Sequence, residues 1–365
     1  MRVRRRLSGR KGAPRPPNVS ETRRMKTLRT RFTEMIGVVH PVMQEGLGPY
    51  KTVQLAAAVS NAGGLGTVSI PGISEDPTVG AAKLRGYIEQ ACALTDRPFA
   101  VNIPVGADKH GHVLPFSAAY VRAVTAAVKD REIAKRLRVI TTSAGPPAAA
   151  RRLIEGSGLI HVHKVGGTRQ AIRAAQEGVN MVIASGYEAG GHTHARPVHT
   201  FVLGPSVTEA VDCPVILAGG IRDGRGLAAA LALGAEAVAL GTRFVASHDN
   251  PDWHPAFAQR ILAAREGDDI LFQALYGPSR ALASGGINEL AELEAKGGLS
   301  EEEITRFKDE RLIAAQRDGD VEGGILPCGQ IAGAINDLIH VAEFVPGMVS
   351  EAIAVLERLR RLQVS

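Results

Sequence analysis

The sequence predicts an α/β protein built as a single (β/α)8 TIM barrel, with a C-terminal insertion after strand eight. From residue 32 onward, short apolar runs alternate with longer Ala-rich segments of helical period, a pattern that indicates parallel strands covered by helices. Hydrophobic residues make up 45% of the 365 residues and aromatic residues only 4%, which suits such a core better than an antiparallel sandwich. A doubly wound open sheet is the alternative arrangement of the same elements.

The pattern predicts eight strands. Because strand-to-strand crossovers are right-handed, eight parallel strands can close into a barrel. The expected strands are Val38–Met43, Leu65–Ser69, Phe99–Ile103, Val139–Thr142, Ile160–Lys164, Met181–Ala184, Val215–Ala218 and Ala237–Leu240. The expected helices between them lie near residues 52–61, 78–94, 117–136, 147–155, 168–176, 200–211 and 224–233.

The pattern changes after the eighth strand. The barrel proper is assigned to residues 32–247, and residues 248–320 are interpreted as an insertion or lid over its mouth. This stretch combines turn signals with one charged helix, Ser300–Arg317, which opens with Ser followed by Glu residues, the start of a capping box. Residues 321–365 are expected to complete the barrel, with a last helix at Val349–Leu362.

The net charge of +6 comes from the first part of the chain. Residues 1–31 hold twelve Lys and Arg and one acid, a charge of about +11, so the other residues carry about −5. A basic tail can bind nucleic acid or anionic lipid. We expect instead a disordered leader, or a start codon assigned too early with Met25 opening the chain, and neither a nucleic-acid nor a membrane partner. No apolar run approaches the ~18–20 residues that span a membrane.

Cysteine and histidine usage argues against disulfides and metals. An odd number of cysteines without metal-ligand spacing fits a reducing compartment, so a cytoplasmic location is expected; they are Cys92, Cys213 and Cys328. Two pairs of histidines lack acidic partners at metal spacing, so no metal site is expected; they are His161 with His163 and His192 with His194. If Lys164 points into the barrel, His161 and His163 face the helices, because alternate residues of a strand share a face.

Two strand ends carry the sharpest functional signal. The strand at 215–218 runs directly into Gly219 and Gly220, and the strand at 237–240 runs directly into Gly241 and Thr242. A phosphate needs several backbone N–H donors at close range, and glycine lets the main chain approach it. In barrels such a site lies in the loops after strands seven and eight. The sequence therefore predicts a phosphate clamp here, although one such glycine pair alone would indicate only a turn.

The loop after strand six carries candidate titratable groups. It runs from Ser185 through Glu188, Gly190 and Gly191 to His192. This places an acid and a histidine at the end of the barrel where the active site is expected. Because the pKa of histidine is ordinarily near ~6.5, His192 can take and return a proton at neutral pH. A histidine that only caps the loop is the structural alternative.

Taken together, these segments resemble the nitronate monooxygenase (2-nitropropane dioxygenase) family over roughly residues 30–345. The matching motifs are Pro41-Val42-Met43-Gln44, Val101-Asn102, His163-Lys164, Glu188-Ala189-Gly190-Gly191-His192, Ala218-Gly219-Gly220-Ile221, Leu240-Gly241-Thr242-Arg243-Phe244 and Gly329-Gln330-Ile331-Ala332-Gly333. FMN-dependent enoyl-acyl-carrier-protein reductases and flavin quinone reductases share the resemblance. It therefore indicates FMN more specifically than it indicates the reaction.

The resemblance implies a set of cofactor-binding residues and one catalytic base, His192. Ser185 departs from the family, because many relatives carry Gln or Glu there and the shorter side chain cannot reach the same flavin contact. Met43 and Gln44 would lie beside the isoalloxazine, and Asn102 and Lys164 would hydrogen-bond the flavin. The remaining expected FMN-binding residues are Gly190, Gly219, Gly220, Gly241, Thr242 and Gln330.

The resemblance implies FMN-dependent oxidation of nitronates or nitroalkanes with O2, giving carbonyl compounds and nitrite. His192 would remove the α-proton of a neutral nitroalkane, while the flavin supplies the redox chemistry. The alternative is an FMN enzyme that takes hydride from NAD(P)H and reduces an enoyl thioester or a quinone. A homodimer is a candidate assembly.

Overall fold

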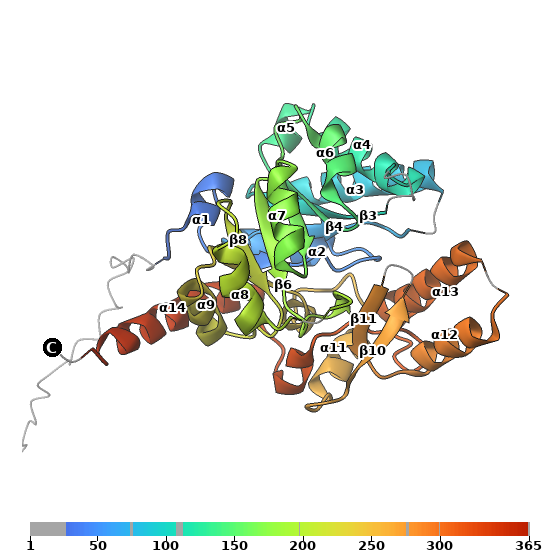
Figure 1. The fold of residues 1–365 in the computed structure, drawn as a ribbon. Helices are drawn as coiled ribbons and strands as arrows, with labels where there is room; N and C mark the ends of the chain where they lie inside the picture. The colour runs from blue at the N-terminus through green and yellow to red at the C-terminus, as the bar shows by residue number, and fades with distance from the viewer. Residues whose placement is uncertain are drawn as a thin grey trace, which may run out of the picture.

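Eight parallel strands form a closed barrel in the computed structural model, which describes residues 27–73, 76–106, 112–196, 198–274, 277–298 and 300–363 (Figure 1). The order of the strands in the sheet is β1-β9-β8-β6-β5-β4-β3-β2. A parallel bridge between Met43 and Leu65 joins the two ends of this order. The predicted TIM barrel is thus confirmed. Its strands are β1 (Val42–Gln44), β2 (Gly66–Ser69), β3 (Phe99–Val105), β4 (Leu137–Ala144), β5 (Ile160–Val165), β6 (Met181–Ser185), β8 (Val215–Ala218) and β9 (Ala237–Leu240).

Helices cover the outside of the barrel between successive strands. They are α2 (Val53–Asn61), α3 (Pro77–Leu94), α4 (Pro115–Ala127), α5 (Arg131–Ala134), α6 (Pro147–Ile154), α7 (Thr168–Gln176), α8 (Thr200–Thr208) and α9 (Gly224–Ala232). The last helix, α14 (Val341–Arg360), packs against α9 and α2 and closes the ring. It begins at Val341, before the expected Val349, and contains Pro346.

A short helix closes the N-terminal end of the barrel. This helix, α1 (Arg31–Ile36), begins with a capping box at Thr30. Its Phe32 and Ile36 are buried in one cluster with the apolar side chains inside the barrel. The backbone N–H of Arg31 donates to the Glu236 carboxylate, just before β9. Because this end is closed, a site inside the barrel has to open at the other end.

The first strand and the chain before it differ from the expectation. Strand β1 begins at Val42 and not at Val38, because Pro41 offers no N–H and the amides of Val39 and His40 donate to the Gly63 carbonyl instead. Residues 27–31, expected to be leader, contact the barrel: the Thr27 hydroxyl donates to the Val39 carbonyl at 2.6 Å. Residues 1–26, including most of the expected leader, lie outside the described residues.

The segment after β9 forms a lid on the side of the barrel opposite α1 (Figure 1). We call residues 269–318 the lid. A hairpin and three helical segments make it up: β10 (Asp269–Ala274), β11 (Gly277–Leu282), α12 (Gly285–Lys296), α13 (Glu301–Ile313) and a π-helical turn, η1 (Ala314–Asp318). Two helices, α10 (Thr242–Val245) and α11 (Pro255–Leu262), lead into it. The expected capping box of α13 is present, with Ser300 and Glu303 bonded reciprocally.

The lid is also joined to the loop after β6. Strand β11 pairs antiparallel with a two-residue strand, β7 (Gly191–His192), so the lid sheet has the order β10-β11-β7. The loop with the candidate base is therefore part of the lid sheet.

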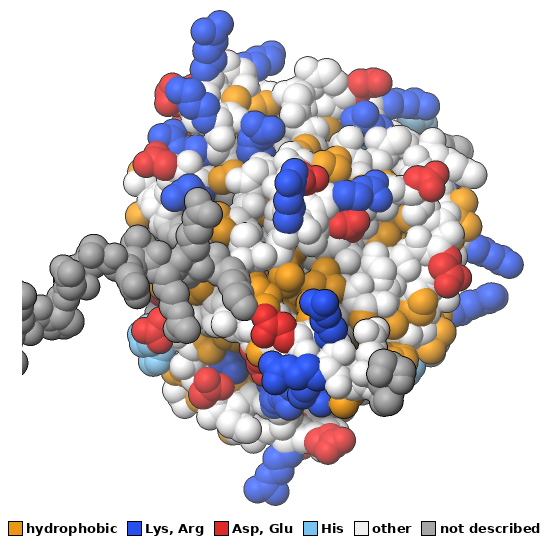
Figure 2. All heavy atoms as spheres, turned by 90° about the vertical axis from the view of Figure 1, so that its left-hand side faces the viewer, with side chains coloured by type: hydrophobic (Ala, Val, Ile, Leu, Met, Phe, Trp, Pro, Cys, Tyr) orange, Lys and Arg blue, Asp and Glu red, His pale blue; other side chains and the backbone are white. Residues whose placement is uncertain are grey.

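The surface carries charges of both signs. On the face shown in Figure 2, basic and acidic side chains are scattered between small apolar areas. None of the helices in the described part of the chain has the length and apolar character needed to cross a membrane.

Candidate active site

A cavity of about 480 Å³ opens at the carboxyl ends of the barrel strands, beneath the lid. This lies within the range of about 300–1,000 Å³ that is usual for small-molecule sites. Nine of the residues predicted from the sequence line it: Asn102, Lys164, Ser185, Gly190, His192, Gly219, Gly220, Gly241 and Thr242. The structure therefore gathers residues from five strand ends around one space.

Three predicted residues do not line the cavity. Met43 is fully buried among the apolar side chains inside the barrel. Gln44 is also fully buried, and its side-chain amide donates to the Thr67 carbonyl at 2.9 Å. Gln330 is exposed, and its backbone N–H donates to the Glu188 carbonyl. In this arrangement none of the three side chains reaches the cavity where the flavin is expected. Their role in flavin binding stays a prediction.

The two glycine turns lie side by side. Ala218 at the end of β8 pairs with Ala239 in β9, so the turns that follow leave neighbouring strands. Gly219 and Gly220 have φ of 99° and 69°, the left-handed region that glycine adopts without strain. A Cβ on Gly219 would lie 3.0 Å from the Thr200 hydroxyl. The turn therefore needs glycine, and its main chain faces the cavity without a covering side chain.

The second turn adds a hydroxyl donor. The Thr242 Oγ1 accepts the backbone N–H of Gly329 at 3.0 Å, which leaves its hydroxyl hydrogen for another acceptor. Main-chain amides and this hydroxyl at one cavity wall are donors of the kind that a phosphate needs, and their binding of the FMN phosphate stays a prediction.

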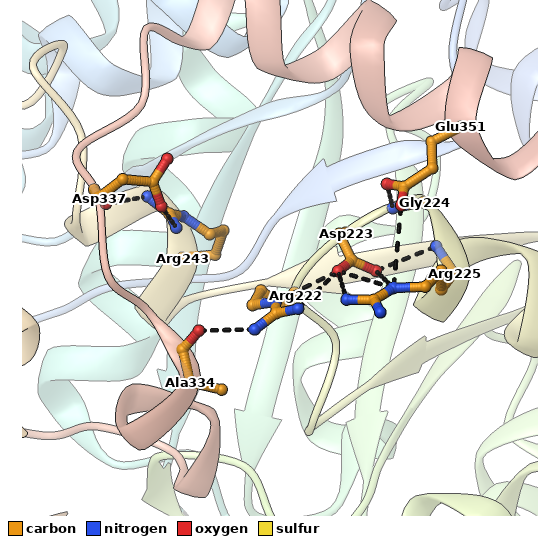
Figure 3. A network of polar contacts seen from close by, with 8 residues as sticks. All are labelled: Arg222, Asp223, Gly224, Arg225, Arg243, Ala334, Asp337 and Glu351. Carbon is orange, nitrogen blue, oxygen red and sulfur yellow. Dashed lines mark hydrogen bonds and ion pairs between the residues drawn. The ribbon is translucent and has the colours of Figure 1, made fainter. Parts of the chain in front are cut away.

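Arginines tie both turns to one C-terminal segment, residues 329–337, which we call the strap (Figure 3). Arg222, next to the first turn, donates from Nη1 to the Ala334 carbonyl at 2.7 Å. Arg243, next to the second, donates to the Asp337 carboxylate at 2.8 Å and to the Ala246 carbonyl at 2.9 Å. Arg243 is only 3% exposed, so its bonds to the strap are shielded from water. The strap therefore helps to hold the second turn of the clamp in place.

The start of α9 is fixed by a carboxylate beside the first turn. Asp223 caps the helix by accepting the Arg225 backbone N–H. Burial by itself would raise the pKa of Asp223, but hydrogen bonds from Arg225 and Arg222 outweigh it and lower the pKa to about 2. The backbone N–H of Gly224 donates to the Glu351 carboxylate of α14 at 2.8 Å (Figure 3). Asp223, Arg225 and Glu351 therefore hold the loop in place, and none of the three lines the cavity.

Lys164 and Asn102 lie on the barrel wall of the cavity. The Lys164 Nζ is 3.6 Å from a carboxylate oxygen of Glu45. The Asn102 side-chain amide donates to the Thr141 hydroxyl at 2.9 Å. A Cβ on Gly46 would overlap the Asn102 side chain at 2.2 Å, so Gly46 makes room for it. This wall offers a cation and an amide at the place where the flavin is expected.

Because Lys164 points into the cavity, its neighbours in β5 point away from it. His161 and His163 are buried and both contact the Thr142 hydroxyl, at 2.7 and 2.8 Å. Burial lowers the pKa of His161 to about 3, with further lowering by His163 and Arg151, and lowers the pKa of His163 to about 4. The described residues contain no cluster of His, Cys, Asp or Glu side chains that could hold a metal ion.

His192 lies where the lid meets the barrel loop. It is exposed and lines the cavity. Its Nε2 is 3.5 Å from the Nζ of Lys308 on α13. Burial, followed by the positive charges of Lys308 and Lys164, holds the pKa of His192 well below its ordinary value. The imidazole is thus neutral at physiological pH and able to accept a proton.

Glu188, the acid of the same loop, has a structural role. Its carboxylate accepts the backbone N–H of Thr200 at 3.0 Å and the Thr200 hydroxyl at 2.9 Å. The Thr200 hydroxyl also lies 3.1 Å from the Gly219 carbonyl. Glu188 therefore fixes the start of α8 and the adjoining glycine turn.

Sequence reasoning missed the residues that the lid contributes. Lys308 and Gln316 line the cavity from α13 and η1. Arg280 of β11 forms a buried ion pair with Asp269 and donates to the Tyr187 carbonyl at 3.1 Å. In the sequence, the helix that carries Lys308 looks like a charged surface element. The spacing of Lys308, Leu312 and Gln316 on one helix face was the only available signal.

A sequence model of the nitronate monooxygenase family matches residues 29–351. The chain is 31% identical to a (3aS,4S,5R,7aS)-5-hydroxy-7a-methyl-1-oxo-octahydro-1H-indene-4-carboxyl-CoA dehydrogenase of Rhodococcus jostii, over 93% of its own length and 100% of the relative's. The structure of FabK from Thermotoga maritima superimposes with a TM-score of 0.79 and 34% identity, covering 92% of this chain and all of that one. A nitroalkane oxidase from Streptomyces ansochromogenes gives a TM-score of 0.72 and 25% identity, covering 89% and 99%.

The family assignment agrees with the geometry of the cavity. The glycine turns, the barrel-wall lysine and the neutral histidine surround one space of suitable size. The chain therefore belongs to the nitronate monooxygenase family and is an FMN-dependent oxidoreductase.

Proposed function

We propose that the enzyme oxidises a nitroalkane or its nitronate with O2, giving a carbonyl compound and nitrite. The observation that carries the proposal is the neutral imidazole of His192, which lines the same cavity as the glycine turns. A neutral base is needed because a nitroalkane has to lose its α-proton before it is oxidised. The likeness to a nitroalkane oxidase over 89% of the chain supports this choice.

The protein's part in this reaction is proton transfer and electrostatics. The Nε2 of His192 takes the α-proton, and the electron pair of the C–H bond moves onto the nitro oxygens. Positive charge in the cavity wall stabilises the resulting anion. FMN, when bound, supplies the electron acceptor and the reaction with O2. Lys308, Leu312 and Gln316 of the lid form part of the wall of this space.

A second candidate is an FMN oxidoreductase of a thioester, with NAD(P)H as electron donor in the reducing direction. The observation that favours it is the end-to-end match to a carboxyl-CoA dehydrogenase, at 31% identity. A thioester carbonyl also acidifies its α-carbon, so His192 and Lys308 could act on it in the same way.

Anaerobic reduction of the bound flavin separates the two functions. The FMN-loaded enzyme is mixed with ethylnitronate, with NADH or NADPH, or with saturated acyl-CoA, and the loss of flavin absorbance is followed. Bleaching by ethylnitronate alone supports nitronate oxidation. Bleaching by NAD(P)H, with recovery on addition of an enoyl-CoA or a quinone, supports the reductase and contradicts the first proposal.

A further inference from the structure

A lysine of the lid faces the cavity from a buried position. Lys308 is 9% exposed and lines the cavity with Leu312 and Gln316 on the same face of α13 and η1. Removing an ammonium group from water is costly unless an anion compensates for it. A buried lysine on the wall of a ligand cavity therefore needs an explanation.

The carboxylates near Lys308 offset the cost of its burial only in part. Asp309 accepts the backbone N–H of Ile73 at 2.7 Å, and Glu294 lies on the neighbouring helix α12. Burial lowers the pKa of Lys308 to about 8, although the charges of Asp309 and Glu294 raise it. At neutral pH the ammonium is thus mostly charged and contacts the Nε2 of His192 at 3.5 Å, a long contact that a ligand can replace.

The second cavity lysine is placed differently. Lys164 belongs to the barrel strand β5 and is paired with Glu45. Lys308 belongs to the lid, on the side of His192. The two cations therefore enter the cavity from different elements, Lys164 from the barrel wall and Lys308 from the lid.

We propose that Lys308 is the anion-binding residue of the substrate subsite, where its ammonium holds the oxygen that becomes negative as His192 removes the α-proton. This inference rests on the proposed function and extends it to a substrate class. The ligand is a small molecule with a planar oxyanion next to an acidic carbon, either a nitronate or the enolate of a thioester. The C–H bond breaks, the proton goes to Nε2, and the electron pair goes to the oxygen beside Lys308. Apolar side chains in the same lining, Ile73, Phe272, Leu312 and Ile331, would contact the carbon chain.

The test uses propionate, an unreactive planar oxyanion, and the FMN-loaded enzyme. Propionate binding is measured from the change in the flavin absorption spectrum, so no turnover is needed. Lys308→Met keeps the length of the side chain and removes the charge, and we expect the Kd of propionate to rise about 10-fold or more. Lys308→Arg is expected to stay close to wild type. The matched control is Lys296→Met, on the adjacent lid helix, with a side chain 72% exposed.

The outcomes separate this inference from the proposed function. Weaker propionate binding by Lys308→Met, with FMN retained and Lys296→Met unchanged, supports the anion site even if ethylnitronate is not a substrate. If Lys308→Met binds propionate as wild type does, or if wild type shows no binding, the inference is wrong. For the true substrate we expect kcat/KM of Lys308→Met to fall about 10²–10³-fold, the loss typical of a removed oxyanion donor.

Discussion

Ser279 of the lid is the direct antiparallel partner of His192 in the barrel loop. The adjoining pair is hydrogen-bonded, with the Thr193 N–H donating to the Pro278 carbonyl at 2.9 Å. In an antiparallel ladder the pair beside a hydrogen-bonded pair, here Ser279 and His192, has its side chains close together on one face of the sheet. The position of the base therefore depends on the position of the lid hairpin.

Arg280, the next residue of the hairpin, is expected to be needed for stability and for the placement of His192. It is paired with Asp269, and the two side chains are only 4% and 8% exposed. Arg280→Met leaves a buried carboxylate without its partner, so the free energy of unfolding should fall by about 3–5 kcal/mol, as measured by urea unfolding. The double variant Arg280→Met/Asp269→Leu should recover part of this loss. A single variant as stable as wild type would contradict the prediction.

Replacing the base should separate proton transfer from oxidation. His192→Asn cannot accept the proton, so kcat/KM for neutral nitroethane should fall about 10²–10⁴-fold, the usual contribution of a general base. The loss for preformed ethylnitronate should be much smaller, because that substrate has already lost its proton. Oxygen consumption measures both, and the flavin spectrum checks that FMN remains bound. Equal losses for the two substrates would exclude His192 as the base.

The barrel could be predicted from the sequence because its signals are local. Apolar runs such as 215–218 and 237–240 coincide with β8 and β9, and parallel strands buried on both sides read as continuous apolar segments. Gly219 and Gly220, which follow the first of these runs, have positive φ, where glycine is favoured. The glycines of the predicted clamp could be found because each follows directly on such a strand.

The lid half of the site could not be predicted in this way. Lys308 lies in a helix with many other charged residues, Glu301–Ile313, and only its packing over the barrel mouth distinguishes it from a solvent-exposed lysine. The pairing of His192 with Ser279 joins segments far apart in the chain, which no local pattern encodes. Met43 and Gln44 match the family motif but are packed inside the barrel, and a motif alone does not show which way a side chain points.

Arg243 is expected to control FMN affinity without touching the cofactor. Its guanidinium joins the turn at Thr242 to the strap through Asp337. Arg243→Met removes these bonds and should raise the Kd of FMN about 10-fold, a change of about 1.4 kcal/mol, because the turn is no longer held in its binding geometry. Flavin fluorescence on titration of the apoenzyme measures the Kd. Arg317→Met, which breaks an exposed ion pair with Asp318, is the control and should leave FMN binding unchanged.

Acid should destabilise the barrel through the buried histidines of β5. The pKa values of His161 and His163 are about 3 and about 4 in the folded protein, against an ordinary value near ~6.5 in the unfolded chain. As the pH falls below about 6.5, the unfolded chain binds protons that the folded protein does not, so the free energy of unfolding falls by up to about 1.4 kcal/mol per pH unit for each histidine. Above neutral pH neither residue contributes a pH dependence. Urea unfolding between pH 7.5 and 5 should show a shallower pH dependence for His161→Gln than for wild type. A His161→Gln profile parallel to wild type would show that His161 titrates alike in both states.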